Sequence, residues 1–256
     1  MEKLTVVKVG GKVVEEEHQL TRLLADFAGM EGYSILVHGG GRLATQLAAA
    51  LGVESRMVEG RRVTDAEMLK IVTMVYAGWI NKTIVARLQA LGINAIGLTG
   101  VDMNVIRSEK RPAETVDYGF VGDVKQVNAD ALSLLLQHGM VPVLSPLTHD
   151  KQGHLLNTNA DTIAGETAKA LAGKFDVTLI YCFEKSGVLM DEADGRSVIA
   201  AMDRSLFRQY REQGIITGGM IPKLENAFQA IDAGVSRVII TGASDIRKNR
   251  GTLIRK

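Results

Sequence analysis

The sequence predicts an α/β protein, a three-layer sandwich in which a mainly parallel central sheet is flanked by helices. The main observation is that short β-branched runs alternate with segments of helical periodicity along most of the chain. This alternation is typical of parallel strands whose connecting helices cover both faces of the sheet. The composition agrees, because 46% hydrophobic and 23% charged residues over 256 positions describe one globular chain that can bury about 70–75% of its unfolded surface.

The first part of the chain predicts two strands, each followed by a helix. Residues 4–9 and 34–38 are apolar runs rich in β-branched residues, and each ends in consecutive glycines. Residues 18–30 and 43–51 carry apolar side chains at helical spacing. The predicted order is therefore strand, helix, strand, helix.

A long helical region is predicted next, from Thr64 to about Leu91. Residues 64–67 read Thr-Asp-Ala-Glu, which fits a capping box that satisfies two free backbone donors at a helix start. Residues 105–127 instead predict short antiparallel strands, because polar turns interrupt them. These strands would form an insertion on the main sheet.

The second half of the chain continues the alternation. A helix is predicted from Asp161 to Ala172, and Pro222 suits the first turn of a later helix. We expect a boundary between an N-terminal lobe of residues 1–172 and a C-terminal lobe of residues 173–256. The remaining strands of the central sheet are predicted at residues 94–98, 141–144, 177–182 and 235–241.

Charge and cysteine content argue against several classes of protein. There are 30 Lys and Arg against 29 Asp and Glu, a formal net charge of +1, so neither nucleic acid nor an anionic membrane is an expected partner. The single cysteine cannot form an intramolecular disulfide, which favours a reducing, cytoplasmic location. No signal peptide and no run of about twenty apolar residues occur, so neither secretion nor membrane insertion is expected.

Two glycine clusters and one lysine point to a phosphate site. Lys8 lies two residues before Gly10-Gly11, at the carboxyl end of a predicted strand, where open α/β sheets bind ligands. Residues 39–41 are three glycines, whose amides can approach an anion closely. Either cluster alone is a weak signal, since tight turns use glycine for shape. Neither is a Walker A loop or the spaced glycine fingerprint of dinucleotide-binding folds.

At this point five segments, in order along nearly the whole chain, resemble the motifs of the amino acid kinase family. They are Lys8-Val9-Gly10-Gly11, His38-Gly39-Gly40-Gly41, Gly60-Arg61-Arg62-Val63-Thr64, Asn157-Thr158-Asn159-Ala160-Asp161 and Gly218-Gly219-Met220-Ile221-Pro222-Lys223.

This resemblance implies phosphoryl transfer from ATP to the side-chain carboxylate of an N-acyl-L-glutamate, which gives an acyl phosphate and ADP in arginine biosynthesis. Magnesium is expected to bridge the phosphates of ATP. A glutamate side chain has an ordinary pKa of about 4.3, so the nucleophile is already ionised at neutral pH and needs no general base. Catalysis would then depend on positioning and on charge compensation.

By the same resemblance, Lys8, Lys223 and Asp161 are the expected catalytic residues. The two ammonium groups would hold the transferring phosphoryl group between them, and Asp161 would keep them apart and charged. Backbone amides would bind the remaining oxygens. The phosphate-binding glycines are Gly10 and Gly11, and the substrate-binding glycines are Gly40 and Gly41.

Arg62 and Asn157 are the expected contacts of the acceptor. A guanidinium group can bind the α-carboxylate in two places, and an amide side chain offers both a donor and an acceptor to an acylated amine. Two simpler explanations stay open at this point. Arg62 could form a solvated pair with Arg61, and Asn157 could cap the helix that opens near Asp161.

The resemblance places the nucleotide next to the predicted strand at residues 177–182, although residues 183–185 read Phe-Glu-Lys and depart from the family's usual turn. A glutamate there can still accept a hydrogen bond from a ribose hydroxyl. The expected nucleotide-binding residues are Glu184, Lys185, Ser186, Gly187, Val188, Leu189, Ile215, Ile216 and Thr217.

Other functions stay open beside this one. A sister kinase acting on carbamate, unacylated glutamate, aspartate or UMP is the nearest alternative, and a non-catalytic sensor of acyl-glutamate or arginine belongs to another class. A nicotinamide-dependent oxidoreductase is disfavoured by the missing glycine fingerprint. The sequence also leaves open whether the acyl group is acetyl or succinyl.

The resemblance extends to assembly and regulation. Family members inhibited by arginine share an extra N-terminal helix that links dimers into a hexamer. This chain begins directly with its first predicted strand at Leu4. We therefore expect a homodimer without arginine feedback.

Overall fold

The central sheet has eight strands in the order β12-β14-β13-β11-β1-β2-β8-β5. The computed structural model describes residues 1–58, 60–248 and 250–256. Among those residues every neighbouring pair in this sheet is parallel except β13 with β14, which confirms the predicted, mainly parallel sheet. The strands are β1 (Lys3–Val9), β2 (Tyr33–His38), β5 (Ala95–Leu98), β8 (Val141–Leu144), β11 (Asp176–Phe183), β12 (Ala201–Met202), β13 (Arg237–Gly242) and β14 (Thr252–Ile254).

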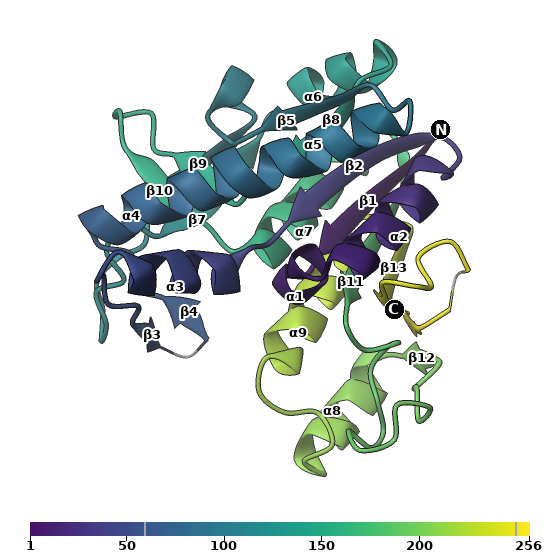
Figure 1. The fold of residues 1–256 in the computed structure, drawn as a ribbon. Helices are drawn as coiled ribbons and strands as arrows, with labels where there is room; N and C mark the ends of the chain where they lie inside the picture. Colours follow the sequence, from purple (N-terminus) through teal and green to yellow (C-terminus); the bar gives the residue numbers. More distant parts are fainter. Residues whose placement is uncertain (59, 249) are drawn as a thin grey trace.

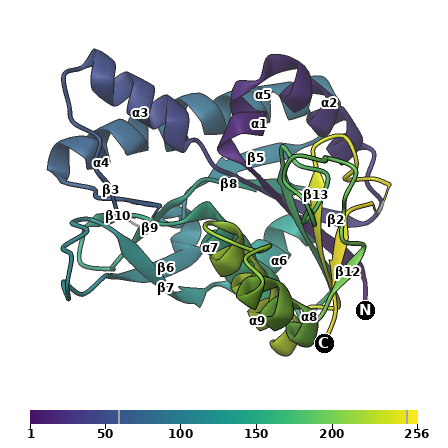
Figure 2. The ribbon, with the colours of Figure 1, turned by 90° about the horizontal axis from the view of Figure 1, so that it is seen from below.

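Helices cover both faces of this sheet, so the molecule has the three layers that the sequence predicts (Figures 1 and 2). The apolar side chains of the two faces form two separate clusters, one against α1 to α5 and the other against α6 to α9. The helices are α1 (Gly11–Glu15), α2 (Glu17–Ala28), α3 (Gly41–Ala50), α4 (Ala66–Thr73), α5 (Asn81–Ala90), α6 (Ala129–Gln137), α7 (Ala160–Leu171), α8 (Arg204–Glu212) and α9 (Met220–Asp232), with a short 3₁₀ turn η2 (Asp102–Asn104).

A second sheet of four strands, in the order β10-β9-β6-β7, lies on the side of the molecule toward which β1 and β2 run (Figure 1). Its strands β6 and β7 pair antiparallel, which confirms the insertion predicted within residues 105–127. A short hairpin, β3 with β4, lies near the same end. These strands are β3 (Met57–Val58), β4 (Arg61–Arg62), β6 (Ile106–Lys110), β7 (Gly122–Val127), β9 (Leu147–His149) and β10 (Leu155–Asn157).

The long helical region begins two residues later than predicted. Asp65 is the N-cap of α4, and its side chain accepts a hydrogen bond from the amide of Met68. Thr64 cannot be the cap, because its backbone pairs with the segment around Gly119 and its side chain is fully buried. A π-helical segment, η1 (Met74–Ile80), joins α4 to α5, so the helical region is continuous to Ala90.

The remaining predictions for the elements agree with the structure. Pro222 lies in the first turn of α9, where its missing amide donor costs no hydrogen bond. The expected lobe boundary near Gly173 stays a prediction, and the central sheet contains strands from both sides of it. Within the described part of the chain, no helix is both long enough and apolar enough to cross a membrane.

Candidate active site

Lys8 faces α7 and α9 because of its position in β1. Side chains alternate between the two faces of a strand. Leu4 and Val6 belong to the apolar cluster on the α7 and α9 side of the sheet, while Val7 and Val9 belong to the cluster on the other side. The same alternation directs Lys8, which is only 9% exposed, toward α7 and α9.

Asp161 and Lys223 meet Lys8 on that face. The side chain of Asn159 caps α7, since its Oδ1 accepts hydrogen bonds from the backbone amides of Asp161 and Thr162. This cap fixes Asp161 in the first turn of the helix. The ammonium of Lys8 lies 2.6 Å from Oδ1 of Asp161, and Lys223 in α9 donates to Oδ2 at 2.9 Å. One carboxylate therefore holds two ammonium groups that come from opposite ends of the chain.

The electrostatics of this triad keep Asp161 ionised. Burial alone would raise the pKa of Asp161, but the charges of Lys8 and Lys223 outweigh burial and hold that pKa well below its ordinary value. Two cations around one anion leave an excess of positive charge at the site. This excess suits an anionic ligand.

The two glycine turns lie against each other at the ends of β1 and β2. The first turn is Gly10-Gly11, and the second is Gly39-Gly40-Gly41. The amide of Gly10 donates to the carbonyl of Cys182, and the amide of Gly39 donates to that of Val9. A methyl group on Gly11 would lie 3.4 Å from the amide nitrogen of Gly40. Both turns therefore present backbone rather than side chains at one place, as expected for a phosphate site.

His38 supports the second glycine turn from the interior of the protein. Its ring is fully buried, and Nδ1 lies 2.9 Å from the carbonyl of Gly39 while Nε2 lies 3.2 Å from the amide nitrogen of Asn81. Burial lowers the pKa of His38 to about 4. The ring is therefore neutral at pH 7, with Nδ1 donating to Gly39 and Nε2 accepting from Asn81.

Arg62 is buried and is not a member of a solvated arginine pair. Its Nη2 donates to the carbonyl of Gly41 and to the hydroxyl of Thr45, both at 2.7 Å, and its Nη1 donates to the hydroxyl of Ser55 at 3.0 Å. These partners are neutral, and so is Met68, whose Sδ accepts from Nη1 at 3.8 Å. Arg61 beside it is exposed, so the two arginines differ in role.

Asn157 at the end of β10 does not cap α7, since Asn159 does so. Its side chain is buried and donates to the hydroxyl of Thr64 at 3.0 Å. Asn157 and Arg62 both line one cavity, called the acceptor cavity below because the acceptor is expected there.

That acceptor cavity has a volume of about 190 Å³ and lies between the second glycine turn, the β3–β4 hairpin and the four-stranded sheet. A larger cavity of about 690 Å³ is lined by Lys8, Lys223, Gly10 and Gly11. It is called the nucleotide cavity below because the nucleotide is expected there. Both cavities are lined by Gly41, Met57 and Arg62, so they meet at the second glycine turn.

The expected nucleotide contacts divide into two groups. Glu184, Lys185 and Thr217 line the nucleotide cavity, and Ser186 lines a neighbouring hollow. The other expected residues do not line the nucleotide cavity. Gly187 packs against Val198 and Thr252, and Ile215 packs against the hydrophobic core. Val188, Leu189 and Ile216 are buried in that core.

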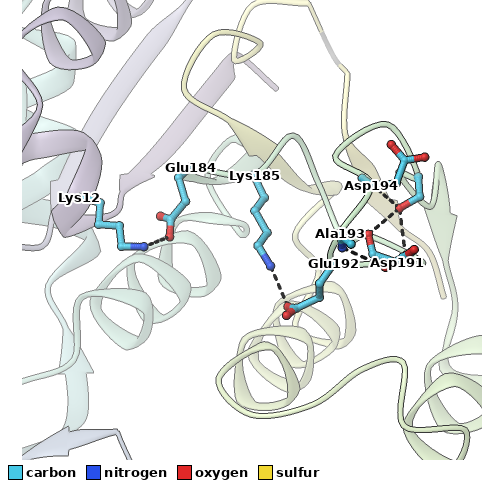
Figure 3. Close-up of polar contacts among 8 residues, drawn as sticks. Lys12, Glu184, Lys185, Asp191, Glu192, Ala193 and Asp194 are labelled. Carbon is cyan, nitrogen blue, oxygen red and sulfur yellow. Dashed lines mark hydrogen bonds and ion pairs between the residues drawn. The ribbon is translucent and has the colours of Figure 1, made fainter.

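Sequence reasoning missed several residues that line these cavities. Lys12 lies directly after Gly11, and its ammonium lies 2.8 Å from Oε1 of Glu184; Figure 3 shows this contact. Lys185 turns the other way and pairs with Glu192 at 2.7 Å. The position of Lys12 beside a predicted phosphate turn was a usable signal. No sequence spacing marked Arg111 and Tyr76, which line the acceptor cavity from distant elements.

Other candidate groups are inert or absent in the described part of the chain. Burial raises the pKa of Cys182 to about 12, so its thiol is not a nucleophile at neutral pH. Among the residues that the structure describes, no group of three His, Cys, Asp or Glu side chains could hold a metal ion.

Comparison with known proteins finds matches along nearly the whole chain. The family model for the amino acid kinase family matches residues 3–242. A protein named acetylglutamate kinase from Parabacteroides distasonis is 70% identical over 254 residues, 99% of this chain and 100% of that protein. Another of the same name, from Methanopyrus kandleri, is 43% identical over 256 residues and covers 98% of this chain and 100% of its own.

Solved structures show the same fold. The protein smu.665 from Streptococcus mutans superposes with a TM-score of 0.81 at 28% identity, covering 98% of each chain. An N-acetylglutamate synthase from Neisseria gonorrhoeae, complexed with coenzyme A and N-acetyl-glutamate, gives a TM-score of 0.84 at 21% identity over 99% of this chain and 59% of its own. A carbamate kinase from Giardia lamblia gives 0.70 at 15% identity, covering 99% and 98% of the two chains.

Proposed function

The chain belongs to the amino acid kinase family, and we propose that it transfers the γ-phosphoryl group of ATP to the side-chain carboxylate of N-acetyl-L-glutamate. It is an enzyme with acetylglutamate kinase activity, and its products are an acyl phosphate and ADP. The observation that carries this proposal is the convergence of Lys8 and Lys223 on Asp161, at a cavity floored by two glycine turns.

The acceptor carboxylate is its own nucleophile. With an ordinary pKa of about 4.3 it is ionised at neutral pH, so the protein has no proton to remove before attack. The obstacle is the repulsion between this anion and the charged phosphates of ATP. The site therefore has to supply positive charge and orientation.

Lys8 and Lys223 supply that charge. Asp161 holds both ammonium groups on one side of the glycine turns, with distances to its two oxygens of 2.6 and 2.9 Å. From there they can neutralise the charge that spreads over the phosphoryl oxygens during transfer. The backbone amides of Gly10, Gly11 and the second glycine turn would donate hydrogen bonds to the phosphoryl oxygens that the two lysines do not contact.

ATP would occupy the nucleotide cavity with its phosphate chain over Lys8, Lys223 and the first glycine turn. Thr217 and Glu184 line the cavity farther out and would contact the ribose or base. Magnesium would enter as part of the nucleotide, since Mg²⁺ is commonly held by substrate phosphates with few protein ligands.

The acceptor would bind in the smaller cavity with its α-carboxylate on Arg62. The guanidinium donates to neutral oxygens and to the sulfur of Met68, and a carboxylate would replace some of these contacts with stronger, charge-assisted hydrogen bonds. Asn157 would contact the acylated amine. Because both cavities meet at Gly41, the γ-carboxylate then points toward the phosphoryl group.

N-succinyl-L-glutamate is a second candidate acceptor, favoured by two further guanidinium groups. Arg61 and Arg111 both line the acceptor cavity. Arg111 donates to Asp123 through Nε at 3.1 Å and is partly exposed. A succinyl group adds a distal carboxylate, which either arginine could bind.

The experiment that tests the activity mixes the protein with magnesium, ATP and one acceptor at a time, and traps acyl phosphate with hydroxylamine. The acceptors are N-acetylglutamate, N-succinylglutamate, unacylated glutamate, aspartate and carbamate. Hydroxamate with an N-acylglutamate supports the proposal, and the ratio of kcat/KM for the two acyl forms decides between them. Product only with an unacylated acceptor, or none with any, rejects it.

The cellular setting follows from the chemistry. Acylation of the amine prevents it from attacking the activated carboxyl group, which suits a step of arginine biosynthesis that feeds a reductive step on the acyl phosphate. We place this activity in the cytoplasm, where ATP is abundant. We also propose a homodimer, for which the exposed Trp79 on η1 provides apolar surface.

A further inference from the structure

The register of the central sheet brings Lys12 and Glu184 together. Strands β1 and β11 are parallel neighbours, with Val9 opposite Cys182, so the segments that follow them leave the sheet side by side. Lys12 follows β1 by three residues and Glu184 follows β11 by one. Both residues line the nucleotide cavity. Their side chains are half exposed and meet at 2.8 Å, and Figure 3 shows the pair.

The Lys12–Glu184 ion pair is weak enough for Lys12 to exchange Glu184 for another anion. The two side chains are 51% and 40% exposed, so water competes with the interaction and the pair is weak. By contrast, Lys8, Lys223 and Asp161 are each less than one fifth exposed. An anion of higher charge than a carboxylate can therefore take Lys12 from Glu184, whereas the buried triad stays in place.

The charges around the nucleotide cavity also favour exchange. A bare carboxylate in this cavity would repel an incoming phosphate chain, and the ammonium of Lys12 offsets this repulsion. The pKa of Glu184 is raised by burial but lowered more strongly by its hydrogen bond and charge interaction with Lys12, so the carboxylate is ionised at neutral pH. The charge of Lys185 also lowers this pKa, but the ammonium of Lys185 pairs with Glu192 rather than with Glu184 (Figure 3).

We propose that Lys12 is a ligand of the nucleotide's phosphate chain, and that Glu184 holds its ammonium in the nucleotide cavity until nucleotide binds. On binding, Lys12 moves from the carboxylate to phosphate oxygens, and Glu184 becomes free to accept hydrogen bonds from the ribose. This inference rests on the proposed function, because it assumes that the larger cavity binds ATP. It adds a third lysine to the phosphate site, beside Lys8 and Lys223.

Direct binding tests the proposal with two simple probes. Inorganic tripolyphosphate with magnesium represents the phosphate chain alone, and adenosine represents the nucleoside alone. Titration calorimetry on Lys12→Met is expected to show about tenfold weaker binding of tripolyphosphate and ADP. Adenosine is expected to bind Lys12→Met at least as tightly as it binds the wild type, because Glu184 has then lost the partner that keeps it from the ribose. Lys12→Arg keeps the charge and is expected to bind tripolyphosphate within about threefold of wild type.

A second pair of variants distinguishes a phosphate ligand from a residue that only neutralises Glu184. In a Glu184→Gln background there is no carboxylate left to neutralise. If Lys12 contacts phosphate, adding Lys12→Met to that background still weakens tripolyphosphate about tenfold. A change of twofold or less there overturns the proposal, and so does wild-type tripolyphosphate affinity in Lys12→Met itself.

Two controls keep the outcomes separate. The ammonium of Lys174 lies 2.8 Å from a carboxylate oxygen of Asp130 in an exposed ion pair, and neither residue lines either cavity. Lys174→Met is therefore expected to bind every probe like the wild type. Kinase activity of the wild type reports on the proposed function. If the wild type is active and Lys12→Met binds tripolyphosphate as tightly as the wild type does, this inference alone is overturned. If the wild type neither phosphorylates an acceptor nor binds tripolyphosphate, both the inference and the proposed function are overturned.

Discussion

At the scale of single residues, Asp161 is the shared partner of the two catalytic lysines of the proposed mechanism. Removing either lysine leaves one carboxylate oxygen without its cation and one side of the phosphoryl group without charge compensation. The two lysines therefore act as one unit. Their effects on turnover are expected to overlap rather than multiply.

We predict that Lys8→Ala and Lys223→Ala each lower kcat by roughly 10²–10³, the loss typical of one oxyanion donor. The double variant is expected to fall by less than the product of the two losses. Release of ADP measures turnover, circular dichroism checks that the fold persists, and Lys174→Ala serves as the matched control. Near-normal kcat in either single variant contradicts the assignment.

His38 gives a prediction about pH. In the unfolded chain its pKa is about 6.5, whereas burial lowers it to about 4 in the folded protein. Between these values the unfolded state binds more protons, so the free energy of unfolding falls as the pH falls from about 6.5 to about 4.

Urea denaturation at several pH values between 4 and 7 measures this dependence. The variant His38→Gln removes the titrating ring while keeping an amide that can bond to the turn. We expect its stability to change less over this range than that of the wild type. An identical pH profile for both proteins assigns the dependence to other groups.

The residues of the candidate site were predictable to different degrees. Lys8, Asp161 and Lys223 occur within motifs whose order matches a known family, so their convergence followed from the resemblance. Arg111 reaches the acceptor cavity only through the pairing of β6 with β7, which sequence spacing does not encode. The apolar Ile215 and Ile216 fit a nucleotide wall and a buried strand end equally well by composition; in the structure Ile215 packs against the core and Ile216 is buried in it.

At the scale of elements, η1 sets the shape of the second glycine turn. Ile80 and Tyr76 of η1 pack directly against Gly40. A methyl group on Gly40 would overlap Cδ1 of Ile80 and lie 3.2 Å from the ring of Tyr76. A side chain at this position would therefore force Ile80 to move and would crowd Tyr76.

We predict that Gly40→Ala destabilises the protein by about 1–3 kcal/mol, the usual cost of overpacking a buried site. Ile80→Val removes the overlapping Cδ1, so the double variant is expected to recover part of that loss. A double-mutant cycle measured by urea denaturation gives the coupling between the two positions. Additive effects show that Ile80 is not the obstacle.

Local patterns predicted most of the elements but not their ends. The parallel strands were visible because β-branched runs alternate with helical segments. The capping box at residues 64–67 was wrong, because the backbone of Thr64 pairs with the segment at Gly119, which lies far away in the sequence. The π-helical segment was also missed, since its packing under Gly40 is a tertiary feature.

At the scale of the whole molecule, exposed apolar side chains on η1 bear on assembly. Trp79 is 70% exposed and Met74 is 52% exposed, although both lie in a helix whose other side is buried. We predict a homodimer in sedimentation velocity, with about twice the 27.6 kDa mass of one chain. Trp79→Glu is expected to weaken the dimer, and a monomer at micromolar concentration in the wild type contradicts the prediction.

The position of β1 in the middle of the sheet has a consequence for synthesis. Its neighbour β11 ends at Phe183, so a ribosome that adds roughly 5–20 residues per second completes β11 on the order of ten to thirty seconds after β1. During that interval the backbone N–H and C=O groups along one edge of this apolar strand have no permanent partner. Productive expression therefore depends on how well that edge is shielded, and slower growth or added chaperones are expected to raise the yield of native protein.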